Sequence, residues 1–130
     1  MDCDEFIARV RERGEYRSTD EAQKITEDVL EVLGQRIDAG QAEDLASRMP
    51  DPLGRALTGP GRRQPEEFGI EEFYRRVADR TGARPRTAQW DAGAVLTTVA
   101  DSVTGGELDR FVSRLPAGYA VLFGRADPAG

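Results

Sequence analysis

The strongest constraint on the fold of this chain is a segment that occurs twice. Residues 37–50 read IDAGQAEDLASRMP, and residues 103–116 read VTGGELDRFVSRLP. Each begins with a polar residue and one or two glycines, continues with apolar residues at helical spacing and ends in proline. A repeat of this length predicts two copies of one helical unit that bury their apolar faces against each other.

The residues that precede the repeated segment also pair up between the copies. Helical spacing of apolar residues predicts a first helix over Asp4–Arg13 in copy one and over Glu71–Arg80 in copy two. Gly14 and Gly82 follow these helices directly, where a residue in the left-handed conformation is usual. We therefore expect both glycines to end their helices.

A second, longer helix is expected in each copy, running to about Arg36 in the first and Ser102 in the second. Copy one begins it with a predicted capping box from Ser18 to Glu21, in which each residue satisfies a free amide group of the other. Copy two has Pro85 at this point, a residue that suits the first turn of a helix.

The repeated segment itself predicts a third, shorter helix in each copy. Capping boxes are predicted at Asp38–Gln41 and Thr104–Glu107, and proline ends the segment at Pro50 and Pro116. Short fourth helices are expected to follow, with matched apolar residues at Leu53, Leu57, Tyr119 and Phe123.

These elements predict an all-α fold, a bundle of about seven or eight helices built from two tandem homologous helical units. The expected division is repeat 1 at 1–57, a linker at 58–69, repeat 2 at 70–124 and a tail at 125–130. The linker assignment depends on the glycine and proline content of residues 58–65. Both repeats are expected to share one compact domain.

The chain resembles the bacterial and archaeal domain of unknown function 2267 family over about residues 5–123. The resemblance consists of cap and core positions, and it is clearest in copy two: Phe73, Val77, Val95, Leu96, Gly106, Glu107, Leu108, Phe111, Leu115, Pro116, Tyr119 and Phe123. It implies a tandem helical fold and supplies no catalytic residue.

Composition restricts the classes of function. The net charge is −6, all of it carried by residues 1–57, so binding to nucleic acid is disfavoured. We expect no membrane span, because no long apolar run occurs. The acidic start lacks signal-peptide features, and Cys3 is the only cysteine, so we expect a cytoplasmic protein.

Catalytic chemistry finds little support in the sequence. The chain has no histidine, which removes the commonest general base and metal ligand. Glu27, Asp28 and Glu31 share one helix face and could hold a hard cation such as Mg²⁺, although a solvated acidic face is the favoured interpretation. We therefore predict no enzyme activity, no catalytic residue and no cofactor.

The second helices differ in the residues that face away from the core. A helical wheel assigns Ala22, Val29, Leu30, Leu33 and Ile37 to the core in copy one, and Ala88, Ala92, Val95, Leu96, Val99 and Val103 in copy two. The opposite face of copy one is predicted to be exposed and holds Lys24, Glu27, Asp28, Glu31 and Gln35. Copy two has Trp90, Gly93, Ala94 and Thr97 instead.

A tryptophan among small residues on an outer face predicts a covered surface. Either the linker or a helix of copy one packs over Trp90, or a partner covers it; a third alternative is a tryptophan that is simply exposed. The leading functional hypothesis is an interaction or adaptor domain, possibly a homodimer, that uses Trp90, Gly93, Ala94 and Thr97. The alternatives are a small-ligand sensor with a pocket between the repeats and a carboxylate-dependent metal-binding protein.

Overall fold

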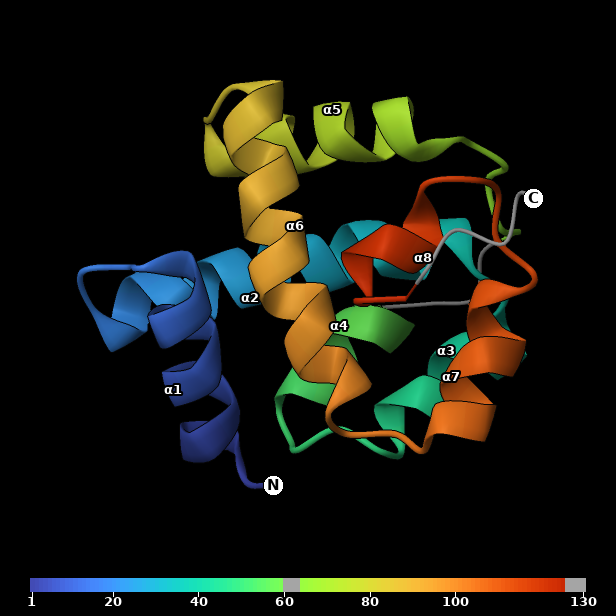
Figure 1. Cartoon of the computed structure of the whole chain (residues 1–130), viewed down its shortest axis with the longest axis horizontal. Helices are drawn as coiled ribbons and strands as arrows, with labels where there is room; N and C mark the ends of the chain where they lie inside the picture. Colours follow the sequence, from blue (N-terminus) through green and yellow to red (C-terminus); the bar gives the residue numbers. More distant parts are fainter. Residues whose placement is uncertain (60–63, 126–130) are drawn as a thin grey trace.

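The computed structural model describes residues 1–59 and 64–125, and within them it has eight α-helices and no β-strand (Figure 1). The predicted all-α bundle is thereby confirmed. The helices are α1 (Cys3–Gly14), α2 (Thr19–Arg36), α3 (Ala39–Ala46), α4 (Leu53–Thr58), α5 (Ile70–Thr81), α6 (Pro85–Ala100), α7 (Gly105–Val112) and α8 (Tyr119–Leu122). Residues 126–130 of the predicted tail and 60–63 of the predicted linker lie outside the described residues.

None of the helices in the described ranges is both long enough and apolar enough to cross a membrane.

Local capping signals place the starts of the third helices correctly. In α3, Asp38 Oδ1 accepts the amide of Gln41 at 2.7 Å, and Gln41 Oε1 accepts the amide of Asp38 at 3.2 Å. Thr104 and Glu107 form the same reciprocal box at α7. Both helices end four residues before their prolines, so a short turn separates the last helical residue from the proline.

The starts of the second helices agree in part with prediction. Ser18 Oγ accepts the amide of Glu21 at 3.1 Å, as expected of an N-cap. The carboxylate of Glu21, however, accepts from the amide of Arg17 rather than Ser18, so the box is displaced by one residue. Pro85 is the first residue of α6, as predicted.

The two glycines at the ends of the first helices have different roles. Gly82 adopts φ 77° and ends α5 in the left-handed conformation, as predicted. The prediction for Gly14 is wrong, because Glu15 takes the left-handed position with φ 56°. Gly14 is needed for space instead, since a Cβ there would lie 2.1 Å from the ring of Tyr16.

One hydrophobic core runs through both halves of the chain. Phe6 and Val10 of α1 are fully buried, and so are Phe73 and Val77 at the matching places in α5. The predicted core positions of α2 and α6 are buried, but Val103 lies beyond the end of α6 and is only partly buried. The helical wheel therefore identifies the core side of both long helices.

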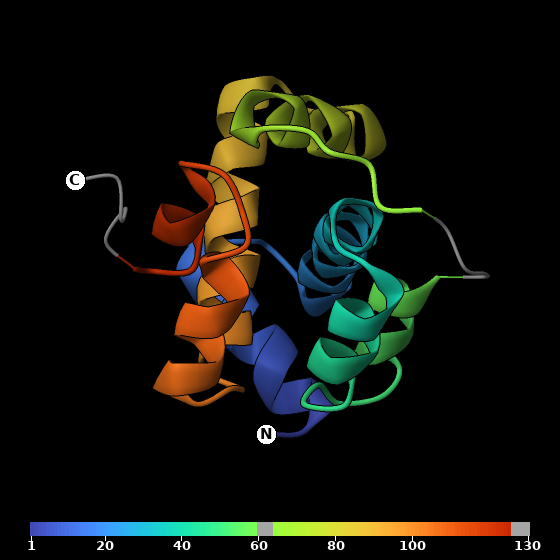
Figure 2. The same ribbon diagram turned by 90° about the vertical axis from the view of Figure 1, so that its right-hand side faces the viewer.

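Each first helix contacts the second helix of its own half and that of the other half. Helix α1 packs against α2 and α6, while α5 packs against α6 and α2. Figure 1 shows α6 crossing the near side of the molecule with α1 beside its lower part and α5 at its upper end. Figure 2 shows α3 with α4 and α7 with α8 on opposite sides of the molecule below α5. The halves are therefore joined by exchanged contacts of their first helices.

Candidate functional site

The first helix covers one flank of α6 through a group of polar contacts. Arg13 donates to Thr98 Oγ1 at 3.0 Å and forms an ion pair with Asp101 at 2.8 Å. Arg9 forms a second ion pair with Asp101 at 3.1 Å. These contacts fix the C-terminal half of α6 against α1.

Matching contacts join the two halves in both directions. Arginines one turn apart occupy equivalent places in α1 and α5, and each reaches the second helix of the other half. The contact of Arg13 with Thr97 matches that of Arg80 with Glu31. The contact of Arg9 with Asp101 matches that of Arg76 with Gln35. Equivalent residues lie 66 or 67 positions apart in the sequence. Reciprocal contacts of this kind are expected of a quasi-twofold arrangement.

A buried acid sits at the upper end of the contact between α1 and α6. Asp91 is 3% exposed, and its Oδ1 accepts a 2.6 Å hydrogen bond from the hydroxyl of Tyr16. Burial raises the pKa of Asp91, and the carboxylate of Glu21 raises it further, while the Tyr16 hydrogen bond opposes both. The pKa of the Tyr16 phenol is also raised, first by burial and second by its hydrogen bond to Asp91.

Trp90 is held in place and yet half exposed. Its indole Nε1 donates to the carbonyl of Gly14 at 3.1 Å, which ties the ring to the end of α1. The residue nevertheless keeps 53% of its surface exposed. One of the predicted alternatives is that a helix of copy one packs over Trp90. Helix α1 does contact Trp90, through the carbonyl of Gly14, but it leaves the residue half exposed.

The other predicted interface residues are not equally accessible. Ala94 is 6% exposed and lies within the folded chain, so little of its surface can contact another molecule. Gly93 is partly exposed, and a Cβ built on it would meet nothing within 4 Å. Thr97 is partly exposed and its hydroxyl bonds to the carbonyl of Gly93 at 2.7 Å. The accessible part of the predicted surface is thus Trp90, Gly93 and Thr97.

The three candidate metal-binding carboxylates are not arranged around a common point. Asp28 pairs with Lys24 at 2.8 Å, and Glu31 pairs with Arg80 of α5 at 2.6 Å. Over residues 1–59 and 64–125, no cluster of three or more acidic or cysteine side chains is placed to hold a metal ion. The prediction that Asp28 is exposed is wrong: only 9% of its surface is accessible, because α2 is covered on more of its circumference than the wheel indicated.

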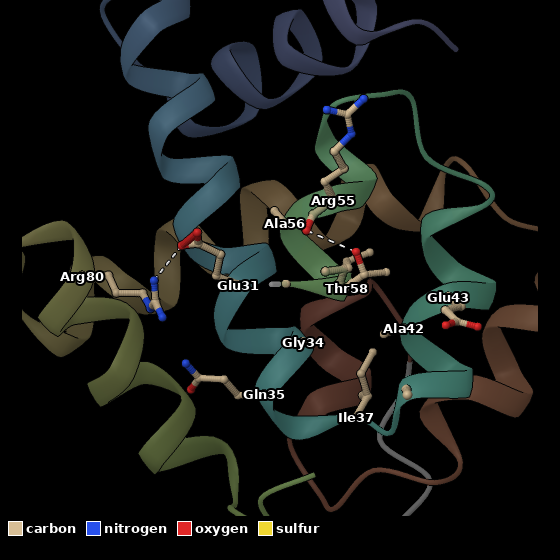
Figure 3. Close-up of a pocket in the computed structure, with 13 residues that line it drawn as sticks. Glu31, Gly34, Gln35, Ile37, Ala42, Glu43, Arg55, Ala56, Thr58 and Arg80 are labelled. Atoms are coloured by element: carbon tan, nitrogen blue, oxygen red, sulfur yellow. Dashed lines mark hydrogen bonds and ion pairs between the residues drawn. The ribbon is translucent and has the colours of Figure 1, made fainter. Parts of the chain in front are cut away.

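A cavity of about 600 Å³ lies between α2, α3 and α4. Figure 3 shows Ile37, Gly34, Ala42 and Thr58 around the hollow, with the pair Glu31–Arg80 at one edge. Apart from Arg80, all its lining residues fall within 31–59. The cavity therefore belongs mainly to the first half, whereas the sequence suggested a pocket between the repeats.

Comparison with known protein families shows which family this chain belongs to. A family model described as "Uncharacterized conserved protein (DUF2267)" matches residues 3–122. This chain belongs to the DUF2267 family. No curated protein matches it.

Three residues of this DUF2267 protein that matter at the α1–α6 contact were not identified from the sequence. Tyr16 lies in the short turn between α1 and α2, the helical wheel gives Asp91 no place on the core or the outer face, and Arg13 is predicted only as the last residue of a helix. Asp91 directly follows Trp90 and precedes the core residue Ala92. An acid within a predicted buried stretch is the signal that could have identified it.

Proposed function

We propose that this protein is a non-enzymatic interaction domain that forms a homodimer through the outer face of α6. The surface, which we call the α6 stripe, consists of Arg86, Trp90, Gly93, Thr97 and Asp101. These residues share one side of the helix, because they follow each other at intervals of three or four. Its C-terminal residues Thr97 and Asp101 adjoin the flank covered by α1, because both contact arginines of that helix.

The exposed indole of Trp90 is the observation that carries the proposal. Trp90 is 53% exposed, and exposed apolar surface costs free energy in water, while the bond of its indole to Gly14 restricts the orientations that the ring can adopt. A large apolar side chain that is already oriented loses little entropy on binding, which is typical of the residues that dominate interface energetics. Gly93 beside it would let a second backbone approach closely.

A second copy of the chain fits the stripe better than an unrelated partner does, because the stripe is complementary to itself. When two α6 helices pair antiparallel about an axis beside Gly93, Trp90 of one copy faces Thr97 of the other. Arg86 of one copy then faces Asp101 of the other, so opposite charges meet at both ends. Arg86 is exposed, with no ion pair among the described residues. Asp101 already pairs with Arg9 and Arg13, and 30% of its side chain remains exposed for a further contact.

The absence of histidine from the sequence also supports a non-enzymatic role, as does the engagement of Glu31, Asp28 and Asp101 in ion pairs.

Sedimentation equilibrium over a range of protein concentrations tests the dimer. The wild-type mass should rise toward twice the chain mass with concentration, and Trp90→Glu should remain monomeric with unchanged helical circular dichroism. Arg86→Glu should weaken association by removing the charge pair. Arg55→Glu, the same charge change on α4, is the matched control and should leave it unchanged.

A wild-type protein that stays monomeric at every concentration would rule out the homodimer. Equal weakening by Arg86→Glu and Arg55→Glu would show that net charge, rather than the α6 stripe, governs association.

A further inference from the structure

We propose that the cavity between α2, α3 and α4, here called the α3–α4 cavity, binds a small, uncharged and mainly apolar molecule. The site does not depend on the α6 stripe. Its volume of about 600 Å³ lies within the range of natural small-molecule sites.

Apolar groups form much of the wall. Ile37 at the end of α2, Ala42 of α3 and Leu57 of α4 line it, with exposed fractions of 2–5%. Gly34 brings α2 and α4 together behind them, since a Cβ on Gly34 would lie 2.3 Å from the carbonyl oxygen of Leu57. The backbones of α2 and α4 are therefore in close contact on this side of the cavity.

The polar side chains around the cavity favour an uncharged ligand. Glu31 is paired with Arg80, and Gln35 accepts a hydrogen bond from Arg76 at 3.0 Å. Figure 3 shows Gln35 away from the hollow and Arg55 extending outward from α4. Two acidic and two basic residues line the cavity, so their charges balance. Glu43 and Arg55, the other two charged lining residues, have no ion pair among the described residues, but both are exposed, so each offers a charged ligand only a solvent-screened counter-charge for the hydration that the ligand loses.

Comparison of the two halves shows why the hollow exists. Ala42 corresponds to Leu108 in the second half, and Leu57 corresponds to Phe123, each 66 residues later. The ring of Phe123 packs edge-to-face on Phe111, with 5.6 Å between centroids, so aromatic side chains fill that region of the second half. The equivalent region of the first half has smaller side chains and keeps an open space. The two halves therefore differ in side-chain size at the place where the first half has its proposed binding site.

Titration with N-phenyl-1-naphthylamine tests the site, because this uncharged aromatic amine becomes more fluorescent in apolar surroundings. The full-length wild type should bind it saturably. Ala42→Leu, which restores the side chain of the second half, should weaken binding by about tenfold or more, because it occupies the space that the probe needs. Ala56→Leu, a second substitution in the wall, should have the same effect.

Ala117→Leu provides the matched control, with the same change of size at an exposed site in the turn before α8. It should bind the probe as the wild type does. Naphthalene-1-sulfonate should bind less tightly than the uncharged probe. Equal affinities for wild type and for folded Ala42→Leu and Ala56→Leu would overturn the proposal, as would the absence of saturable binding or a preference for the sulfonate.

Discussion

The hydroxyl of Tyr16 donates a 2.6 Å hydrogen bond to Asp91, and this joins residues that lie 75 positions apart in the chain. Together with the bond from Trp90 to Gly14, it attaches the end of α1 to the first turns of α6. Among the described residues no other hydrogen bond reaches the Asp91 carboxyl, so the phenol is its principal compensation for burial.

Tyr16→Phe should lower the free energy of unfolding by about 1–3 kcal/mol, because it leaves the buried carboxyl of Asp91 without its donor. Urea denaturation followed by circular dichroism measures the change. Tyr74→Phe is the matched control, since the Tyr74 hydroxyl makes no hydrogen bond to the described residues, and it should stay within about 0.5 kcal/mol of wild type. Equal effects would show that the Tyr16 bond does not stabilise the fold.

Asp91→Asn should change how stability depends on pH. The pKa of Asp91 in the folded protein is raised above its ordinary 3.8, so folding favours the protonated carboxyl. The stabilisation that this gives is fully present below pH 3.8 and is lost as the pH rises through the raised pKa. The stability of wild type relative to Asp91→Asn should therefore fall with increasing pH across this window. Unfolding free energies of both proteins in buffers on either side of it provide the measurement, and a constant difference contradicts the pKa shift.

Gly14→Ala and Gly93→Ala should have opposite effects. The new Cβ at position 14 would meet the ring of Tyr16 at 2.1 Å, so the variant should lose about 1–3 kcal/mol through displacement of that ring. The Cβ at position 93 meets nothing within 4 Å inside a helix, and it should add about 0.5–1 kcal/mol. Thermal unfolding of dilute, monomeric samples compares them, and loss of stability in both would contradict the assigned packing.

Ala42→Leu should raise the unfolding free energy by about 1 kcal/mol, because it buries additional methyl groups in the α3–α4 cavity. The reverse change in the second half, Leu108→Ala, should lower it by about 2–4 kcal/mol, because Leu108 is 3% exposed. Denaturation of the two variants side by side tests both. A destabilised Ala42→Leu protein would show that the hollow cannot accommodate a larger side chain.

Signals within one turn of the chain predicted the helices well. The boxes at Asp38 and Thr104 involve residues three apart, and the stereochemistry of such a short segment admits few alternatives. Helical spacing likewise identified the core side of α2 and α6 from the residues of each helix alone.

Contacts between residues far apart in the chain could not be predicted from the sequence. The bond between Tyr16 and Asp91 and the pairing of Arg80 with Glu31 depend on how α1 and α5 cross the long helices. The helical wheel predicts that Asp28 is exposed because it uses only the residues of α2. In the structure that helix is packed against α1, α4, α5 and α6. The cavity depends on side-chain volumes in three helices at once, so only their relative placement reveals it.

The exchanged packing of α1 and α5 has a consequence for synthesis on the ribosome. Helix α2 relies on α5 for one of its neighbours, and α1 relies on α6. When only the first four helices have emerged from the ribosome, the nascent chain therefore exposes apolar surface that later residues must cover. We expect native structure to appear in a single late step during translation, once α6 has emerged from the exit tunnel.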